Sequence, residues 1–263
     1  MLFNVKLVLL PPLALYFLIC AVLVGFSLTL LFLARWSIHS RIRQGHNELA
    51  GYLFTAVGVI YGVLLAFVAI IVWEQCNDAT GNVVREASRA LALYRDLDLY
   101  PDQTQADPAR QALKAFMRSV VKDEYPALAR GEESPATQQA MEHLWKSAKN
   151  LRPRDPYEQS IFGEILKDIN ALGELRTGRL AAAQTNLPDI VWVALIIGAG
   201  ITLVFSMLFG AEKLWVHVLM ICLLAALMAT TLFLILEMDN PFMGALAPQP
   251  TVYMEVLERM GGK

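Results

Sequence analysis

Four stretches of the chain are apolar and contain no Asp, Glu, Lys or Arg. Each is about 20 residues or longer, which is the length that a helix needs to cross a bilayer core of about 30 Å. Helices are the expected form of these stretches, because a bilayer offers no water to satisfy backbone polar groups. The pattern predicts an all-α integral membrane protein with four transmembrane helices, at Leu13–Ala34, Tyr52–Trp73, Ile190–Phe209 and Leu214–Leu236.

The four stretches come as two close pairs, and a polar insert of about 115 residues separates the pairs. We therefore expect two transmembrane hairpins with a soluble helical bundle between the second and third spans. The predicted divisions are a first hairpin at 1–75, a helical soluble domain at 76–188, a second hairpin at 189–238 and a C-terminal tail at 239–263.

Three dipeptides in the insert carry the signature of a helix start, a capping side chain directly before a proline. They are Asp107-Pro108, Ser134-Pro135 and Asp155-Pro156, and the last adds Glu158 at the capping-box position. From Pro156 the apolar residues recur at helical spacing, which predicts one long helix with a buried face formed by Ile161, Ile165, Ile169, Leu172, Leu175 and Leu180.

The second span is followed by apolar residues at the same spacing and by no proline until Pro101. We therefore expect this helix to continue from the membrane into the insert. Pro126 is expected to break the next helix. The insert is thus predicted to hold about four helices, with Ala109–Tyr125 and Ala136–Lys149 between two long arms.

Composition narrows the class of protein further. The hydrophobic fraction is 56%, charged residues make up 17%, and the net charge of −2 gives no reason to expect nucleic acid binding. The three cysteines offer no disulfide framework in the insert, and no His, Cys, Asp or Glu grouping has the spacing of a metal site. No phosphate-binding loop or nucleophile elbow occurs, so we expect neither a cofactor nor an enzyme.

The side of the membrane on which the insert lies is predicted from the short loops. Arg35, Arg41 and Arg43 in the first hairpin turn, with Lys213 in the second, favour a cytoplasmic position for these turns and an extracytoplasmic insert. Four arginines near the membrane on the insert side favour the opposite orientation, with a cytoplasmic insert. The rule gives charges in long domains less weight than charges in short loops. The four residues are Arg85, Arg89, Arg176 and Arg179.

Each span crosses the membrane once, so the ends of the second and fourth spans and the start of the third lie on the same side. Five acidic residues stand at these helix ends. One interpretation is that they are the solvated ends of helices. The other is an acidic ring around the mouth of a pore in an oligomer, which would concentrate cations. The five residues are Glu74, Asp78, Asp189, Glu237 and Asp239.

Three further features have a structural and a functional interpretation. His217 near the start of the fourth span is either a hydrogen-bonded interfacial residue or a proton-linked group. Asp123 and Glu124 are adjacent and therefore point to different helix faces, which argues against a catalytic pair. The turn that ends in Phe242 either redirects the tail along the membrane surface, with Phe242 as an interfacial anchor, or forms a gate with Trp73-Glu74.

The string from Gly58 to Phe67 (GVIYGVLLAF), leading to Trp73-Glu74, resembles the second span of a family of uncharacterised bacterial membrane proteins named bestrophin-like. Further resemblances follow in the same order along nearly the whole chain: His46-Asn47-Glu48, Ala50-Gly51, Glu86-Ala87, Tyr94-Arg95, Asp123-Glu124-Tyr125, Leu144-Trp145, Pro188 with Trp192, Leu208-Phe209-Gly210, and Asp239-Asn240-Pro241-Phe242 with Gly244.

The family is described by a distant likeness to bestrophins, which are pentameric anion channels with three hydrophobic pore-constricting residues at four-residue spacing in the second span. Aligning on Trp73 and Gln75 implies that Thr55, Val59 and Val63 occupy the constriction. The bulky aromatic residues of a bestrophin constriction are absent here. The bestrophin arrangement also implies a cytoplasmic insert, against the arginine count.

Small residues in the spans support two interpretations. Gly58 and Gly62 have the small-xxx-small spacing that lets helices approach closely in lipid, and the third span contains Gly198, Gly200 and Ser206. Close packing of helices explains them structurally. The functional interpretation is a narrow pore lined by backbone and small side chains, which would include Gly62 beside Thr55, Val59 and Val63.

Together these features predict a homo-oligomeric, channel-like protein of the bacterial inner membrane that conducts inorganic ions through a pore lined by the second span. The resemblance implies a pentamer. The alternative is a non-conducting membrane sensor or scaffold whose helical domain binds a ligand or a protein partner.

Overall fold

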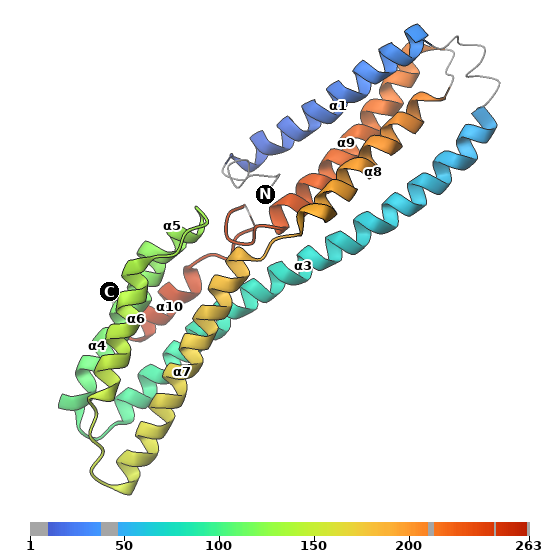
Figure 1. Ribbon diagram of the computed structural model, residues 1–263. Coiled ribbons are helices and arrows are strands. Elements are labelled where there is room, and N and C mark those ends of the chain that lie inside the picture. Colours follow the sequence, from blue (N-terminus) through green and yellow to red (C-terminus); the bar gives the residue numbers. More distant parts are fainter. Residues whose placement is uncertain (1–9, 38–46, 210–212, 245, 262–263) are drawn as a thin grey trace. The chain divides into compact units, whose positions relative to one another are not determined.

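The computed structural model describes residues 10–37, 47–209, 213–244 and 246–261, and these residues form helices, turns and loops with no strand. Figure 1 shows the helices in chain order. The chain divides into two compact units. The first, here called the membrane unit, comprises Met1–Glu74 and Asn186–Asp239, and the second, here called the bundle unit, comprises Gln75–Thr185 and Asn240–Lys263.

The membrane unit contains the apolar helices. They are α1 (Pro12–Ser37), the first half of α3 (Asn47–Leu99), α8 (Asp189–Met207) and α9 (Leu214–Met238). The described residues hold four helices that are long and apolar enough to cross a membrane, as the hydropathy pattern predicts. Helix α1 packs along α9, where Tyr16 and Thr230 share a hydrogen bond of 3.3 Å between hydroxyls.

The bundle unit is formed by the second half of α3 with α4 (Gln103–Ser119), η1 (Val120–Glu124), α5 (Tyr125–Leu128), α6 (Pro135–Lys149), α7 (Pro156–Gln184) and α10 (Thr251–Arg259). Its core is aliphatic and aromatic, and the fully buried members include Leu93, Leu113, Phe116, Leu144, Ile165, Ile169 and Leu172. Burial of these side chains, each about 1.5–3 kcal/mol, stabilises the bundle. Helix α4 lies beside α6 (Figure 1).

Two of the three predicted helix starts are confirmed. Helix α6 begins at Pro135, where Ser134 Oγ accepts a hydrogen bond of 3.3 Å from the Thr137 backbone N–H. Helix α7 begins at Pro156, where Asp155 Oδ1 accepts a bond of 2.7 Å from the Glu158 backbone N–H. The Glu158 carboxylate returns to the backbone N–H of Arg154 at 2.6 Å, one residue earlier than a capping box requires.

The start predicted at Asp107-Pro108 is wrong, because α4 begins at Gln103 and contains Pro108. Asp102 precedes this helix, and its carboxylate accepts hydrogen bonds from the Thr104 hydroxyl at 2.5 Å and the Gln105 amide at 2.7 Å. These bonds order the first turn at a position where the proline pattern gave no signal. Pro108 lies in the second turn of α4, where it has no N–H to donate to the Thr104 carbonyl, so the helix forms with one backbone hydrogen bond fewer.

The break predicted at Pro126 is also wrong. The chain stays helical from α4 through η1 into α5, and η1 is a π-helix in which the Tyr125 backbone N–H donates to the Val120 carbonyl. The wider turn of a π-helix changes the pairing of backbone groups just before the proline, where an α-helix would lose a hydrogen bond. The second span does continue into the insert without interruption, because α3 is one helix of 53 residues.

Residues 240–261 belong to the bundle unit. Phe242 is 5% exposed and packs in the bundle core, so the interfacial anchor predicted for it is wrong. Its ring makes an edge contact with Tyr125, at 6.2 Å between centroids. Tyr253, Val256 and Met260 of α10 join the same core. These residues are therefore buried against the helices of the bundle unit.

Candidate functional site

The residues predicted to line a pore lie on an exposed face of α3 in the membrane unit. Val59 is 61% and Val63 50% exposed, and Thr55 and Gly62 are exposed as well. The Thr55 hydroxyl donates to the Gly51 carbonyl at 2.9 Å, which satisfies it within the helix. A Cβ placed on Gly62 would meet no atom within 4 Å. This face is therefore free to meet lipid, water or another protein surface.

The opposite side of α3 is fixed by Tyr61. This side chain is 5% exposed, and its hydroxyl donates to the Leu195 carbonyl of α8 at 3.0 Å. The ring lies against Gly198, where a Cβ would come within 2.4 Å of a ring carbon. Gly198 thus permits the close approach of α3 and α8, as its small size predicts. The contact of Tyr61 with α8 determines which face of α3 remains exposed.

The acidic residues predicted at a pore mouth divide into two groups. Glu74, Asp78 and Asp189 are exposed, whereas Glu237 is 2% and Asp239 3% exposed. The Asp239 carboxylate accepts hydrogen bonds from the Leu187 backbone N–H at 2.6 Å and from the Trp192 indole at 3.0 Å. Asp239 thereby ties the end of α9 to the start of α8 within the membrane unit.

His217 is buried in the membrane unit, and its Nε2 lies 3.2 Å from the Ser206 carbonyl oxygen. This contact is the one expected of a hydrogen-bonded histidine. Of the predicted cytoplasmic cations, Arg35 lies in the last turn of α1 and Lys213 precedes α9. Arg41 and Arg43 lie outside the described residues.

A cluster of four charged side chains lies in the core of the bundle unit. Glu124 and Arg179 have fully buried side chains, and Glu86 and Arg176 are at most 8% exposed. Arg179 Nε donates to Glu86 at 2.6 Å, and its Nη2 donates to Glu124 at 2.5 Å. Arg176 Nη2 also donates to Glu124, at 2.6 Å. Two carboxylates and two guanidinium groups balance one another, which makes their burial tolerable.

Aromatic side chains close this buried charge cluster. The Tyr253 hydroxyl of α10 donates to Glu86 at 2.8 Å. The Arg179 guanidinium carbon lies 6.0 Å from the ring centre of Tyr125 and 5.9 Å from that of Tyr253. The cluster therefore connects α3, η1 and α7 through hydrogen bonds between charged groups, and it connects α10 through a phenol that donates to a carboxylate.

Burial raises the pKa of Tyr253 well above its usual value, and the nearby Glu86 carboxylate raises it further. Burial opposes the charged form of Arg179, but the two carboxylates outweigh it, so the pKa of Arg179 lies above its usual range. Tyr253 is therefore neutral and Arg179 charged at physiological pH. Arg179 thus supplies a fixed positive charge to the cluster, and Tyr253 supplies a neutral hydrogen-bond donor.

Sequence reasoning missed the cluster, although the signal was present. Arg176 and Arg179 continue the spacing of Ile165, Ile169 and Leu172 along α7, which places them on the buried face. A charged pair on a core-facing stripe indicates buried partners of opposite charge. Among the described residues no three His, Cys, Asp or Glu side chains are grouped as a metal site would require.

The fold and these contacts define the class: a membrane protein whose described residues form four long apolar helices and a helical bundle with a buried charge cluster. Residues 19–253 match the Bestrophin-like domain, so the chain belongs to the bestrophin-like family. No curated protein matches the chain.

Solved structures of low sequence identity share the fold. A bacterial bestrophin homologue from Klebsiella pneumoniae matches with a TM-score of 0.66 at 14% identity, over 94% of this chain and 99% of that one. A point mutant of a Klebsiella pneumoniae homologue gives 0.67 at 15% identity, over 93% and 98% of the two chains. A point mutant described as a membrane protein gives 0.66 at 15% identity, over 91% and 98%.

Proposed function

We propose that the protein is a homo-oligomeric channel of the bacterial inner membrane that conducts inorganic ions through a pore lined by α3. The observation that carries this proposal is the uncovered surface of α3. Only 17% of its most apolar 18-residue window is buried in the single chain, compared with 11% for α1 and 33% for α9. Large side chains such as Ile60, Val63 and Phe67 remain more than 45% exposed there. A second copy of the chain can cover this surface.

The surface also contains the small residues that favour helix association in lipid. A Cβ on Gly58 or Gly62 would meet no atom within 4 Å, so these glycines form a shallow depression on the exposed face. Their place in the single chain leaves them available to a neighbouring copy or to a pore. Five copies around an axis, the arrangement implied by the bestrophin resemblance, would bring Thr55, Val59, Gly62 and Val63 to the axis.

The proposed pore combines an apolar constriction with acidic ends. Val59 and Val63 would form a ring that controls passage by wetting and dewetting. Glu74, Asp78 and Asp189 are exposed and would attract cations toward the mouth. Glu237 and Asp239 belong to the same proposed acidic group, and both are buried. The Asp239 carboxylate also joins the end of α9 to the start of α8 through Leu187 and Trp192.

Ion flux from purified protein in liposomes tests the proposal. We expect flux from the unaltered chain and a clear change in flux after Val63→Trp, which would fill the constriction. Val22→Trp on the exposed surface of α1 is the matched control, because Val22 is 60% exposed and lies outside the proposed pore. Absence of flux from intact oligomers at every voltage and pH tested would sink the channel proposal.

A non-conducting sensor or scaffold is the second candidate, and the buried charge cluster favours it. The cluster joins α10 and α7 to α3, so a ligand or partner that moves α10 would change contacts on the helix that also enters the membrane. A folded protein without flux, whose bundle amides become protected when a partner is added, would support this function over conduction.

We also propose that the spans form two hairpins and that the bundle unit lies outside the cytoplasm, in keeping with the arginine rule. Single cysteines at exposed bundle positions, such as Glu142 and Tyr157, would report the side of the membrane. Labelling of intact cells by a membrane-impermeant maleimide is expected at both positions. Labelling only after cell lysis would place the bundle in the cytoplasm.

A further inference from the structure

A pocket of about 670 Å³ opens on the bundle unit between α10 and the segment formed by α4 and η1. The volume lies in the range of small-molecule sites. Leu257 on its floor is 8% exposed, while Met254 at its edge is 42% exposed. The lining residues are Arg118, Val121, Lys122, Met254, Leu257, Glu258 and Gly261. The pocket therefore has an apolar floor and charged walls.

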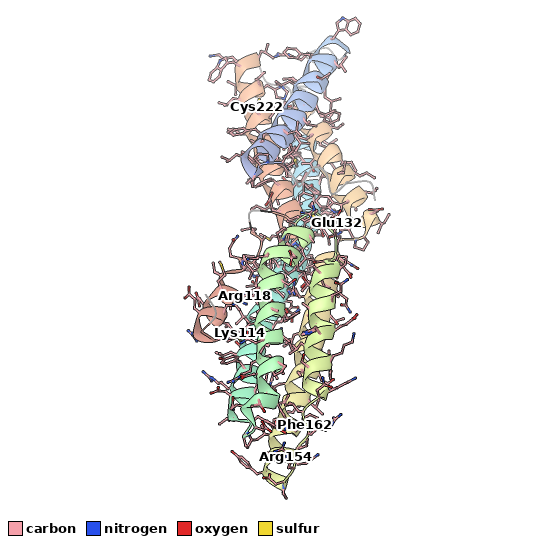
Figure 2. All side chains as sticks on the ribbon, turned by 90° about the vertical axis from the view of Figure 1, so that its left-hand side faces the viewer. Lys114, Arg118, Glu132, Arg154, Phe162 and Cys222 are labelled. Carbon is pink, nitrogen blue, oxygen red and sulfur yellow. The ribbon has the colours of Figure 1, made fainter. Side chains whose placement is uncertain are left out.

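One wall belongs to a row of basic residues at four-residue spacing, Arg110, Lys114, Arg118 and Lys122. Figure 2 shows Lys114 and Arg118 in succession along α4, on the side next to α10. Arg110 pairs with Asp98 at 2.6 Å and with Asp107, and the Lys114 ammonium lies 5.2 Å from the ring centre of Tyr94. Arg118 and Lys122 line the pocket, and Glu258 is the carboxylate among the lining residues that the structure describes.

We propose that this pocket binds a single-chain amphiphilic anion, with its carboxylate or phosphate head at Arg118 and Lys122 and its alkyl chain over Met254 and Leu257. An inorganic anion would leave the apolar floor uncovered. A neutral chain would make no use of the two cations. The amphiphilic anion satisfies both halves of the lining, because burial of its chain and charge pairing of its head act in the same place.

The pocket shares its walls with the buried charge cluster. Glu124 ends η1 and faces the core, while Val121 and Lys122 of the same π-helix face the pocket. On α10, Tyr253 holds Glu86 at 2.8 Å and the next residue, Met254, lines the pocket. A bound amphiphile would fasten α10 to η1 and so strengthen the contacts of both elements with the cluster. Binding at this pocket does not depend on ion conduction.

The test uses the full chain in phosphatidylcholine nanodiscs and a hexadecanoate analogue that carries a diazirine on its alkyl chain. After photolysis, mass spectrometry should find the label on the peptide that contains Met254 and Leu257. Unlabelled hexadecanoate should displace it, and hexadecanol should not. A second arm with the diazirine in the single acyl chain of lysophosphatidic acid distinguishes a free fatty acid from a lysophospholipid, since either probe can label the site alone.

The variant R118Q/K122Q is expected to lower labelling of that peptide about fivefold, the effect of losing two partly exposed charge contacts. M254W should lower it by filling the pocket. The matched control K146Q/K149Q changes two exposed lysines on α6 and should leave labelling unchanged. Circular dichroism establishes that each variant is folded. Equal labelling of a folded R118Q/K122Q variant, equal displacement by hexadecanol, or no label on α10 from either probe would overturn the proposal.

Discussion

At the scale of residues, the Arg179 guanidinium has the largest consequence, because it joins two buried carboxylates. Its side chain is fully buried, and it contacts Glu86 and Glu124 from different helices. A buried ion pair contributes little compared with a well-packed apolar core, but the loss of one partner leaves a buried charge without compensation. Removal of one charged member is therefore expected to lower the free energy of unfolding of the bundle unit.

We expect Arg179→Met to lower the free energy of unfolding of the bundle unit by about 3–5 kcal/mol, because Glu86 and Glu124 then lose their shared cation. Thermal unfolding and hydrogen exchange of bundle amides measure the change. Lys167→Met is the control, since Lys167 pairs with Glu164 on the surface and its side chain is 68% exposed. That substitution should cost no more than about 0.5 kcal/mol. Equal losses for the two variants would contradict a role for the cluster.

Tyr253 gives the bundle a defined pH dependence. Burial raises the pKa of Tyr253, so the folded chain holds the phenol proton more tightly than the unfolded chain. This stability is fully present below the unfolded pKa of about 10, and it is lost as the pH rises from there through the higher folded pKa.

We expect Tyr253→Phe to cost about 1.5–3 kcal/mol at neutral pH, since a hydrogen bond to a charged carboxylate is lost. The stability of the variant should then fall less steeply above pH 10 than that of the unaltered chain. Denaturant unfolding at several pH values measures both effects. Tyr157→Phe, at a site that is 61% exposed, should change neither. Parallel alkaline curves for Tyr253→Phe and the unaltered chain would contradict the assignment.

The residues of α7 show why sequence alone found the helix and missed its charged contacts. Ile165, Ile169 and Leu172 are buried as the spacing predicts. The predicted stripe then continues to Leu175 and Leu180, both only half-buried, whereas Arg176 and Arg179 occupy the core face. The spacing of apolar residues assigns only apolar side chains to the buried face of a helix. The burial of an arginine can be predicted from the sequence only when its carboxylate partner on another element is known.

At the scale of elements, features that depend on the local sequence were predictable, and features that depend on contacts between elements were not. The four spans were predictable, because a bilayer demands long uncharged helices whatever the neighbours. The starts of α6 and α7 were predictable from local capping bonds. The π-helix η1 was not, since neither its backbone pairing before Pro126 nor the contact of Glu124 with α7 is visible in the local sequence. Pro108 likewise shows that a capping dipeptide is not decisive when an upstream residue, here Asp102, orders an earlier turn.

The packing of α3 on α8 gives a prediction at this scale. Gly198→Ala should disturb the membrane unit by about 1–3 kcal/mol, because the new methyl group would collide with the Tyr61 ring and move its hydroxyl from the Leu195 carbonyl. Gly200→Ala is the matched control, since a Cβ there meets no atom within 4 Å in the single chain. Thermal stability of the solubilised protein measures both. Equal melting temperatures for the two variants would contradict this packing.

At the scale of the whole molecule, the apolar surface of α3 is uncovered in the single chain, and we propose that a homo-oligomer covers it. Family membership and the shared fold were foreseeable from the string around Gly58–Phe67 and the residues that follow it. The assembly and the permeant ion are proposals that rest on exposure and charge. The structure of a single chain shows which helix faces are exposed. The protein surface that packs against them is defined only in the oligomer.

The charge of the proposed mouth gives a prediction at this scale. Glu74 is exposed, and a ring of such carboxylates would raise the local concentration of cations. Glu74→Gln should therefore shift the reversal potential in a salt gradient toward that of a less cation-selective pore. Glu142→Gln, an exposed carboxylate on α6, is the control. An unchanged reversal potential for Glu74→Gln would remove Glu74 from the permeation path.

The central claim is that α3 lines an ion-conducting pore, and covalent modification of one position tests it most directly. In a variant that lacks Cys20, Cys76 and Cys222, Val63→Cys would be treated with a methanethiosulfonate reagent while current is recorded across a planar bilayer. Val22→Cys on α1 serves as the control. We expect modification at position 63 to block or strongly reduce the current and modification at position 22 to leave it intact. Full current through oligomers with every position 63 modified would contradict it.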